Sequence, residues 1–245
     1  MGCRSMNVEA FRHEFATAAA TAGFVRRELA STAAGPVEAW TRGNGGRSVY
    51  LSAGIHGDEP AGPLALLELL RGGAFGDDGQ WALCPVLNPT GLAAGTRDNA
   101  GGIDLNRDYR RHRSAETRAH AAWLLARPAP DLFLSLHEDW ETSGFYFYEI
   151  HLGADEPRLA RAILAAVSPW LPPEPNPVID DHQVREPGWI DHPADADLPN
   201  HWPEAIFLAK NACPLSFTFE SPSRAPLARR VAAHVAAVRA CLAFG

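Results

Sequence analysis

Ser48-Val49-Tyr50-Leu51-Ser52-Ala53-Gly54-Ile55 is a mainly apolar run that leads into His56-Gly57-Asp58-Glu59 and then Pro60. The run is short and uninterrupted and is followed by turn residues, so it predicts a buried strand. Proline favours the first turn of a helix, and we expect a helix from Pro60 to Leu70, which Gly72-Gly73 ends. The polar motif at 56–59 therefore lies in the loop that leaves a buried strand. This strand-loop-helix unit is typical of an α/β fold.

Strands and helices continue to alternate along the rest of the chain. The patterns predict further strands at 81–87, 131–136, 145–148 and 214–220, and helices at 114–126, 156–170 and 226–242. An Ala-rich helical pattern occupies 7–30 within an N-terminal helical segment, 1–35, while Gly43–Gly46 is expected to form a hairpin turn and Asn88–Gly91 a turn. The alternation predicts a single domain over residues 1–245, in which helices flank a mixed, mostly parallel twisted sheet.

Composition narrows the class of protein. The 245 residues can bury a full core, and a formal charge of -7 argues against a nucleic-acid partner, which would require a basic face. No apolar stretch is long enough to cross a membrane and no signal-peptide pattern is present, so we expect a cytoplasmic protein without a membrane partner. The four cysteines, Cys3, Cys84, Cys213 and Cys241, are never spaced as C-x-x-C, which argues against a cysteine zinc site.

Four polar residues follow the ends of predicted strands. His56 and Glu59 follow one strand, His137 ends a second, and Glu220 ends a third. Ligands in open α/β sheets gather beyond the C-terminal ends of the strands, so these side chains are expected to converge. Two histidines and a glutamate form the ligand set of a catalytic zinc that keeps one position for water, and a further carboxylate can act as its base. Taken singly, each of these residues is more often an ordinary core or surface residue.

Four segments, in this order along the chain, resemble the M14 zinc carboxypeptidase superfamily, including its succinylglutamate desuccinylase/aspartoacylase-like branch. They are Gly54-Ile55-His56-Gly57-Asp58-Glu59, Arg97-Asp98-Asn99 with Gly102-Ile103-Asp104-Leu105-Asn106-Arg107, Ser135-Leu136-His137, and Thr218-Phe219-Glu220. Together they span most of the chain, and their combination is specific although no single segment is. The resemblance implies a zinc carboxypeptidase-like fold and a zinc-dependent hydrolase.

The resemblance also implies a role for each matching residue. His56, Glu59 and His137 would bind Zn²⁺, and Asp104 would orient a zinc-bound histidine. Glu220 would be the general base, and Arg97 would polarise the scissile carbonyl. Asn106 and Arg107 would bind a substrate carboxylate. A guanidinium matches a carboxylate with two parallel hydrogen bonds, and a carboxylate behind a ligating imidazole fixes its tautomer. The structural alternatives are a salt bridge between Asp104 and Arg107 and an ion pair of Glu220 with Arg224 or Arg229.

The chain departs from the family pattern in one respect. Carboxypeptidases of this family place a tyrosine over the substrate in the segment before the catalytic glutamate, whereas the last tyrosine here is Tyr148. His182, Trp189 or His192 could take that place. The aromatic run 145–148 is expected to face the core, with a pocket wall as the alternative. Together with the short chain, this departure leaves the deacylase branch open.

Residues 171–203 are rich in Pro, Asp, His and Trp and are expected to form an irregular rim of the cleft. This segment contains Asp180, Asp181, His182, Asp191, His192, Asp195, Asp197 and His201. A solvated acidic rim, which could select basic substrates, is favoured over a second metal site because no recurrent ligand spacing is present. Glu138, Asp139 and Glu141 are expected either to support the site or to be exposed turn residues.

The sequence thus predicts hydrolysis of an amide bond adjacent to a free carboxylate, with carboxypeptidase-like action on a small peptide as the leading hypothesis. The alternative on the same scaffold is deacylation of an N-acyl amino acid. A peptide substrate predicts an open cleft near 180–203, and a small N-acyl substrate predicts a closed pocket. A non-catalytic zinc-containing binding module is a third possibility. Glu220 and Arg97 argue against it, since binding alone needs neither a base nor an oxyanion partner.

Overall fold

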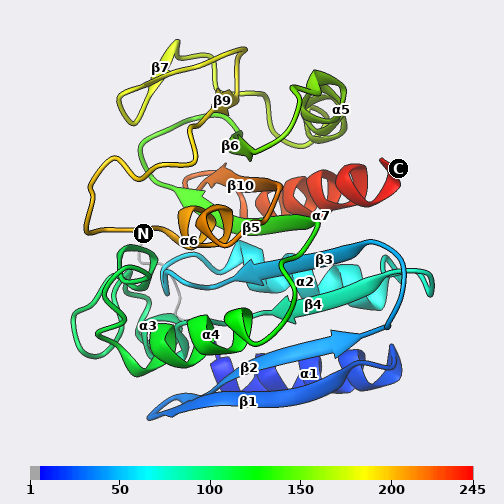
Figure 1. Ribbon diagram of the computed structural model, residues 1–245, viewed down its shortest axis with the longest axis vertical. Helices are drawn as coiled ribbons and strands as arrows, with labels where there is room; N and C mark the ends of the chain where they lie inside the picture. Colours follow the sequence, from blue (N-terminus) through cyan, green and yellow to red (C-terminus); the bar gives the residue numbers. More distant parts are fainter. Residues whose placement is uncertain (1–5, 245) are drawn as a thin grey trace.

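The computed structural model describes residues 6–244, in which helices cover both faces of an eight-stranded sheet (Figure 1). The strand order is β1-β2-β4-β3-β5-β10-β6-β9. The strands of this sheet are β1 Val25–Thr32, β2 Gly35–Arg42, β3 Ser48–Ala53, β4 Gln80–Cys84, β5 Leu132–Asp139, β6 Tyr146–His151, β9 Trp189–Asp191 and β10 Leu215–Pro222. The helices are α1 Val8–Thr21, α2 Ala61–Arg71, α3 Pro89–Ala94, the 3-10 turn η1 Leu105–Arg107, α4 Ala115–Leu125, α5 Pro157–Val167, α6 Glu204–Lys210 and α7 Leu227–Ala243.

Four neighbouring strands, β4, β3, β5 and β10, are parallel and form the middle of the sheet. The pairs β1/β2, β2/β4 and β10/β6 are antiparallel. In β5, every side chain from Leu132 to Glu138 is buried, as expected for a parallel strand covered on both faces. The predicted α/β class and the mixed, mostly parallel sheet are confirmed.

Two apolar layers hold the helices onto the sheet. One layer contains the buried faces of α1, α2, α5 and α7, and the other contains those of α4 and α6 (Figure 1). The parallel strands all point the same way, so the loops that leave β3, β5 and β10 emerge at one edge of the sheet. That edge carries the candidate site.

The N-terminal segment differs from the prediction. Helix α1 ends at Thr21, and residues 25–32 form the edge strand β1, which pairs with β2 from Val25 opposite Thr41 to Thr32 opposite Gly35. The side chains of β1 are exposed or half-buried, so its sequence lacks the apolar alternation that identifies a strand. The helical prediction for 22–30 is therefore wrong. Residues 1–5 of the predicted segment, including Cys3, lie outside the described residues.

Two predicted turns are also corrected. The loop Gly43–Gly46 joins β2 to β3, but β4 lies between these strands, so it is not a hairpin turn. Asn88–Gly91 is not an isolated turn but the start of helix α3. The Asn88 side chain accepts a hydrogen bond of 2.8 Å from the Gly91 N–H and caps the helix.

The segment 171–203 contains more regular structure than predicted. Strands β7 Val178–Ile179 and β8 His182–Gln183 form a small hairpin. The two residues of its turn, Asp180 and Asp181, both have positive φ angles, 47° and 62°, as a two-residue turn of the favoured hand requires. Strand β9 then extends the main sheet by pairing with β6. The remainder of the segment is irregular and borders the cavity described below.

Within residues 6–244, no helix combines the length and the apolar character that a membrane span requires.

Candidate active site

The loop between β3 and α2 carries His56 and Glu59, and its path depends on two glycines. Gly54 leaves the strand with a φ of +59°, a conformation that residues with a side chain rarely adopt. A Cβ atom on Gly57 would lie 1.9 Å from the backbone carbon of Gly91, so the loop passes directly against helix α3. The glycines thereby allow His56 and Glu59 to face the edge of the sheet.

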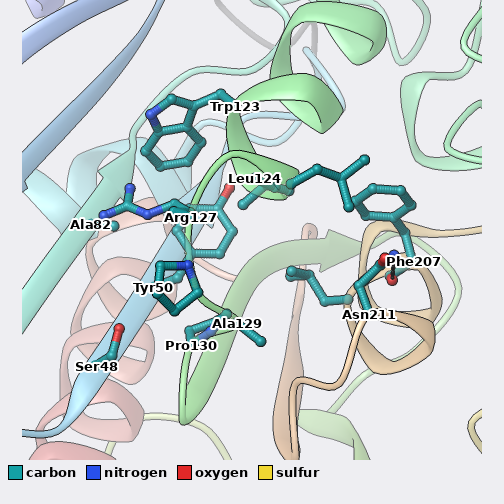
Figure 2. Close-up of a pocket in the computed structure, with 13 residues that line it drawn as sticks. Ser48, Tyr50, Ala82, Trp123, Leu124, Arg127, Ala129, Pro130, Phe207 and Asn211 are labelled. Atoms are coloured by element: carbon teal, nitrogen blue, oxygen red, sulfur yellow. Dashed lines mark hydrogen bonds between the residues drawn. The ribbon is translucent and has the colours of Figure 1, made fainter.

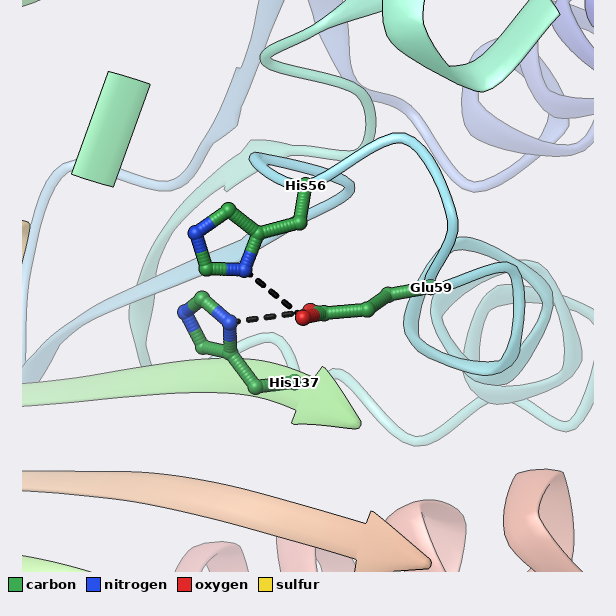
Figure 3. A group of neighbouring side chains, drawn as sticks. All are labelled: His56, Glu59 and His137. Atoms are coloured by element: carbon green, nitrogen blue, oxygen red, sulfur yellow. Dashed lines mark hydrogen bonds and ion pairs between the residues drawn. The ribbon is translucent and has the colours of Figure 1, made fainter. Parts of the chain in front are cut away.

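His56, Glu59 and His137 meet at this edge (Figure 3). His56 Nδ1 lies 2.7 Å from Glu59 Oε1, and His137 Nδ1 lies 2.9 Å from Glu59 Oε2. Only 3%, 5% and 2% of the surface of these residues is exposed. One ligand atom from each residue lies within 4.8 Å of the other two. The three side chains therefore direct two imidazole nitrogens and a carboxylate at a common point.

The electrostatics of the three residues are those of a buried carboxylate between two imidazoles. Burial lowers the pKa of His56, but the Glu59 charge and hydrogen bonds with Asp104 and Glu59 outweigh it and raise that pKa to about 9. Burial would raise the pKa of Glu59, but the charges and hydrogen bonds of both imidazoles lower it to about 2. Burial lowers the pKa of His137. Glu59 is thus ionised in a buried position and requires a positive partner.

This donor set fits a divalent metal ion. Zinc binds imidazole nitrogen and carboxylate oxygen at about 2.0–2.2 Å, and it accepts three protein ligands when it is catalytic. His56 Nε2 lies 3.2 Å from Asp104 Oδ1, which leaves Nδ1 as the nitrogen that faces the other two residues. A bound cation would take the place of the imidazole protons that now hold Glu59.

Arg97 and Asp104 form the next layer around this group. Arg97 Nε donates a hydrogen bond of 3.0 Å to Asp104 Oδ2, and its Nη1 lies 3.3 Å from His56 Nδ1. Burial would raise the pKa of Asp104, but the His56 hydrogen bond and the charges of His56 and Arg97 hold it well below its usual range. Within the described residues Asp104 pairs with Arg97, and the alternative salt bridge to Arg107 is not formed.

Asn106 and Arg107 lie on η1 and line the same cavity. Asn106 is buried, and its Oδ1 accepts a hydrogen bond of 3.0 Å from the backbone N–H of Glu204, at the start of α6. This bond orients the side-chain amide. Arg107 is exposed, and its Nη1 donates to the backbone carbonyl of Asn106 at 3.0 Å.

Glu220 lies on β10, directly opposite His137 of β5 on one side and Tyr146 of β6 on the other. Its carboxylate lines the cavity. Burial, together with the negative charges of neighbouring carboxylates, raises its pKa well above the usual value. Within residues 6–244 it has no hydrogen-bond partner, and the alternative ion pair with Arg224 or Arg229 is not formed. Glu220 is therefore a free carboxyl group beside the three converging residues.

Two tyrosines that the sequence interpretation placed toward the core belong to the cavity. Phe145 and Phe147 pack in the core, whereas Tyr146 and Tyr148, on the opposite face of β6, line the cavity with Glu220. The Phe-Tyr-Phe-Tyr alternation carried this signal, because successive side chains of a strand face opposite sides. Of the residues considered for the missing tyrosine, His182 and His192 line the cavity, whereas Trp189 is fully buried in the core and cannot contact a substrate.

The three acidic residues that follow His137 differ in burial and in role. Glu138 is buried, accepts a hydrogen bond of 2.7 Å from the Ala61 N–H at the start of α2, and forms an ion pair with Arg230. Asp139 accepts a hydrogen bond of 2.9 Å from the Glu141 N–H. Glu141 itself is exposed at the cavity wall. Glu138 thus anchors the helix that follows the loop containing His56 and Glu59.

All eight residues named as site candidates lie around one cavity or directly behind its wall. The cavity has a volume of about 740 Å³ and takes part of its wall from the segment 171–203. A second cavity, of about 180 Å³, lies at the opposite edge of the sheet, where Ser48 begins β3 (Figure 2). Trp123, Arg127 and Phe207 contribute to its wall, which contains neither an imidazole nor a carboxylate. Of these two cavities, only the first is lined by imidazole and carboxylate side chains.

A comparison with protein families identifies the chain from residues 45–169. These residues match the model of the succinylglutamate desuccinylase/aspartoacylase catalytic domain. The chain belongs to this family. The matched region contains His56, Glu59 and His137 as well as the loop with Arg97, whereas Glu220 lies beyond it. The comparison with curated proteins gives no match.

Solved structures agree with this assignment. The "putative metallopeptidase" of Shewanella denitrificans OS217 is 27% identical with a TM-score of 0.82, and covers 94% of this chain and 87% of its own. That of Shewanella amazonensis SB2B is 26% identical with a TM-score of 0.83, covering 95% and 91%. A Pseudomonas aeruginosa metallo-carboxypeptidase in complex with (2-guanidinoethylmercapto)succinic acid shares the fold at 21% identity, with a TM-score of 0.66 and coverages of 94% and 68%. The chain is thus a hydrolase of the desuccinylase/aspartoacylase family with the fold of metallo-carboxypeptidases.

Proposed function

We propose that this family member is a zinc-dependent hydrolase of amide bonds adjacent to a free carboxylate, and that short peptides are its preferred substrates. The observation that carries the proposal is the convergence of His56, Glu59 and His137 beside the free carboxyl group of Glu220 in one cavity. Nδ1 of each histidine and the Glu59 carboxylate would hold the zinc ion. When bound, zinc supplies a Lewis acid and lowers the pKa of a water molecule to about 7.

Glu220 is the residue that we assign to proton transfer. Its side chain faces the cavity, and within residues 6–244 no hydrogen bond restrains it. Burial and nearby carboxylates raise its pKa, and a cation held by the three converging residues would lower it again, so that the carboxylate could accept a proton from the attacking water and deliver it to the leaving amine. General acid–base catalysis of this kind contributes about 10²–10⁴-fold to a rate. Tyr146, opposite Glu220 in the neighbouring strand, would pack beside the substrate.

Arg97, Asn106 and Arg107 are the residues that we assign to the substrate. Arg97 is held by Asp104 next to His56, and from there its charge would stabilise the oxyanion that develops on the scissile carbonyl. Arg107 is exposed to the cavity and can bind the free carboxylate of the substrate with paired hydrogen bonds. The Asn106 oxygen is occupied by the Glu204 N–H, which leaves the NH₂ group as a donor to that carboxylate.

The size of the cavity favours a peptide. Binding sites for small molecules occupy about 300–1,000 Å³, and a cavity of about 740 Å³ can hold more than a single acylated amino acid. An N-acyl amino acid remains the second candidate substrate, because the matching family model is that of a desuccinylase and aspartoacylase domain. Both substrates present an amide bond beside a free carboxylate and would use the same residues.

The test is release of primary amine from a mixed panel of short peptides and N-acyl amino acids by zinc-loaded protein. The matched variants are Glu220→Gln, which removes the proposed base, and Glu141→Gln, which neutralises an exposed carboxylate on the same cavity wall. Release from peptides that Glu220→Gln abolishes and Glu141→Gln retains supports the proposal. Release from N-acyl amino acids alone would support the alternative function, deacylation of an N-acyl amino acid. Zinc binding with no release from any substrate would leave a binding module as the explanation.

A further inference from the structure

A second group of metal-type side chains lies in the segment 171–203. His182 Nε2 is 3.6 Å from Asp197 Oδ2, and His192 Nε2 is 3.6 Å from Asp197 Oδ1. The two imidazole rings lie 4.7 Å apart between their centroids. One ligand atom from each of the three residues lies within 4.8 Å of the other two. The ligand atoms of this group thus lie within the same limit of 4.8 Å as those of His56, Glu59 and His137, although the group is separate from them in sequence.

The backbone places these side chains by three different means. His182 follows the two-residue turn of the β7/β8 hairpin. His192 directly follows β9, and its N–H donates a hydrogen bond of 2.8 Å to the carbonyl of Glu149 in the neighbouring strand β6. Asp197 comes from the irregular loop that follows. Its side chain is 65% exposed, whereas that of His192 is only 8% exposed.

The tautomer of His192 suits a metal ligand. Its Nδ1 lies 2.7 Å from the carbonyl oxygen of Pro193, which can only accept, so Nδ1 carries a proton. In the neutral imidazole the lone pair is then on Nε2, the atom that faces Asp197. A histidine whose other nitrogen donates to a backbone carbonyl has the arrangement that commonly orients metal-binding imidazoles.

The spacing of the three residues suits an ion better than direct hydrogen bonds. At 3.6 Å, each imidazole nitrogen is too far from the Asp197 oxygen for a hydrogen bond of ordinary length. Two ligand atoms that each lie about 2.1 Å from a tetrahedral zinc ion are about 3.4 Å apart. The observed separations are close to this value. Two imidazoles and one carboxylate are also donors that borderline divalent ions such as Zn²⁺ accept.

We propose that His182, His192 and Asp197 form a second divalent-metal site, for which Zn²⁺ is the suitable ion, on the wall of the catalytic cavity. The Tyr148 ring contacts both imidazoles edge-on, with centroid distances of 5.8 Å and 5.7 Å. All three proposed ligands, like Tyr148, line the cavity. An ion at this position ties the β7/β8 hairpin and the loop with Asp197 to the edge of the sheet. Its effect is to order one wall of the cavity. The proposal does not depend on which amide the enzyme hydrolyses.

The experiment measures zinc bound to the full chain, prepared without a histidine tag and stripped of metal, after equilibrium dialysis against Zn²⁺. Wild-type protein is expected to bind two equivalents. His137→Ala removes the first site and is expected to leave one, whereas His192→Ala or Asp197→Asn removes the second and also leaves one. His151→Ala is the matched control. It removes another imidazole at this end of the sheet, 3.4 Å from Asp191, and is expected to keep two equivalents.

A single equivalent in wild-type protein, lost in His137→Ala and kept in His192→Ala, would overturn the second site. Because Asp197 is exposed, Asp197→Asn is expected to fold, so its zinc content tests the second site even if His192→Ala fails to fold. Amide hydrogen exchange gives an independent reading in the His137→Ala background, where only the second site remains. Zinc is expected to slow exchange in residues 178–192 at least about tenfold, and His192→Ala is expected to abolish that protection. Equal exchange with and without zinc would contradict the proposal.

Discussion

Two buried groups of this enzyme contain histidine and glutamate, and they differ in what their imidazole nitrogens face. The first is the group formed by His56, Glu59 and His137, here called the metal group. The second is formed by Tyr50, Ser52, Tyr109, His120 and Glu204, between the sheet and helices α4 and α6, and is here called the polar core group. Both groups are almost fully shielded from solvent.

The hydrogen-bond donors and acceptors of the polar core group pair with one another. Tyr50 Oη donates to Glu204 Oε1 at 2.7 Å, and Ser52 Oγ donates to Glu204 Oε2 at 2.8 Å. His120 can then donate from Nε2 to Tyr50 Oη at 2.8 Å and accept at Nδ1 from Tyr109 Oη at 2.7 Å. The network assigns this tautomer, and burial lowers the pKa of His120 to about 3, so the ring stays neutral.

The metal group is arranged differently. Both imidazoles must direct Nδ1 at the same carboxylate, and a cavity of about 740 Å³ adjoins them. Burial of histidine with glutamate is therefore not a sign of function by itself. Convergence of donors on one point beside a cavity is what distinguishes the candidate site from a structural network.

The largest expected effect comes from removing a ligand of the metal group. His137→Ala should weaken zinc binding by more than about 100-fold, because losing a ligand costs more than losing a residue that orients one. Hydrolysis should fall with the bound metal. Elemental analysis after dialysis and the amine-release assay check both effects. Full zinc occupancy of the metal group in this variant would show that His137 is not a ligand, and it would weaken the distinction between the two buried groups.

Glu220→Gln should lower turnover by about 10²–10⁴-fold and leave zinc content and stability almost unchanged, since it removes a base but no ligand. Turnover and elemental analysis of the same preparation separate the two effects. Loss of zinc from this variant would show that Glu220 belongs to the metal group. Glu141→Gln, on the same wall, is the control and should retain wild-type turnover.

The polar core group should respond to pH through Glu204. Burial raises the pKa of Glu204 from 4.5 to about 7, against hydrogen bonds from Tyr50 and Ser52 that lower it. The folded state therefore holds a proton that the unfolded state has released, and stability falls as pH rises from about 4.5 to about 7. The free energy of unfolding falls by about 3 kcal/mol over this range, because each unit of pKa shift corresponds to about 1.4 kcal/mol. The titratable groups that face Glu204 are Tyr50, Tyr109, His120 and Cys84.

Glu204→Gln removes this titration. The free energy of unfolding of the variant, relative to wild type, should therefore rise by about 3 kcal/mol between pH 5 and pH 8. Urea unfolding at the two pH values measures the difference, and zinc content should be unaffected. A parallel decline in both proteins would mean that another group titrates.

The smallest effect is expected at the outer end of the polar core group. Tyr109→Phe removes the hydroxyl that donates to His120 and should lower the free energy of unfolding by about 1 kcal/mol. Amine release and zinc content should match wild type, because the metal group has no bond to this tyrosine. A change in zinc affinity would show that the two buried groups are coupled. Urea unfolding and equilibrium dialysis decide between these results.

Much of the scaffold could be predicted from local patterns. The run at 48–55 and strand β5, which carries His137, are buried on both faces, so their sequences are mainly apolar. The edge strand β1 could not be recognised because its mostly exposed side chains carry no such pattern, and an Ala-rich helix precedes it. The candidate residues could be predicted because they stand at strand ends and in motifs that resemble a family.

The sequence by itself determined the α/β class, the strand ends that carry His56, Glu59, His137 and Glu220, and the residues expected around them. These features follow from local periodicity and from motifs of adjacent residues. Only the tertiary structure decided that Tyr146 and Tyr148 face the cavity, because the neighbours of β6 determine which of its faces is open. Only the tertiary structure brought His182, His192 and Asp197 together, since a hairpin, a sheet edge and a loop each supply one of them. Contacts of this kind depend on how separate elements pack, and no spacing along the chain records that packing.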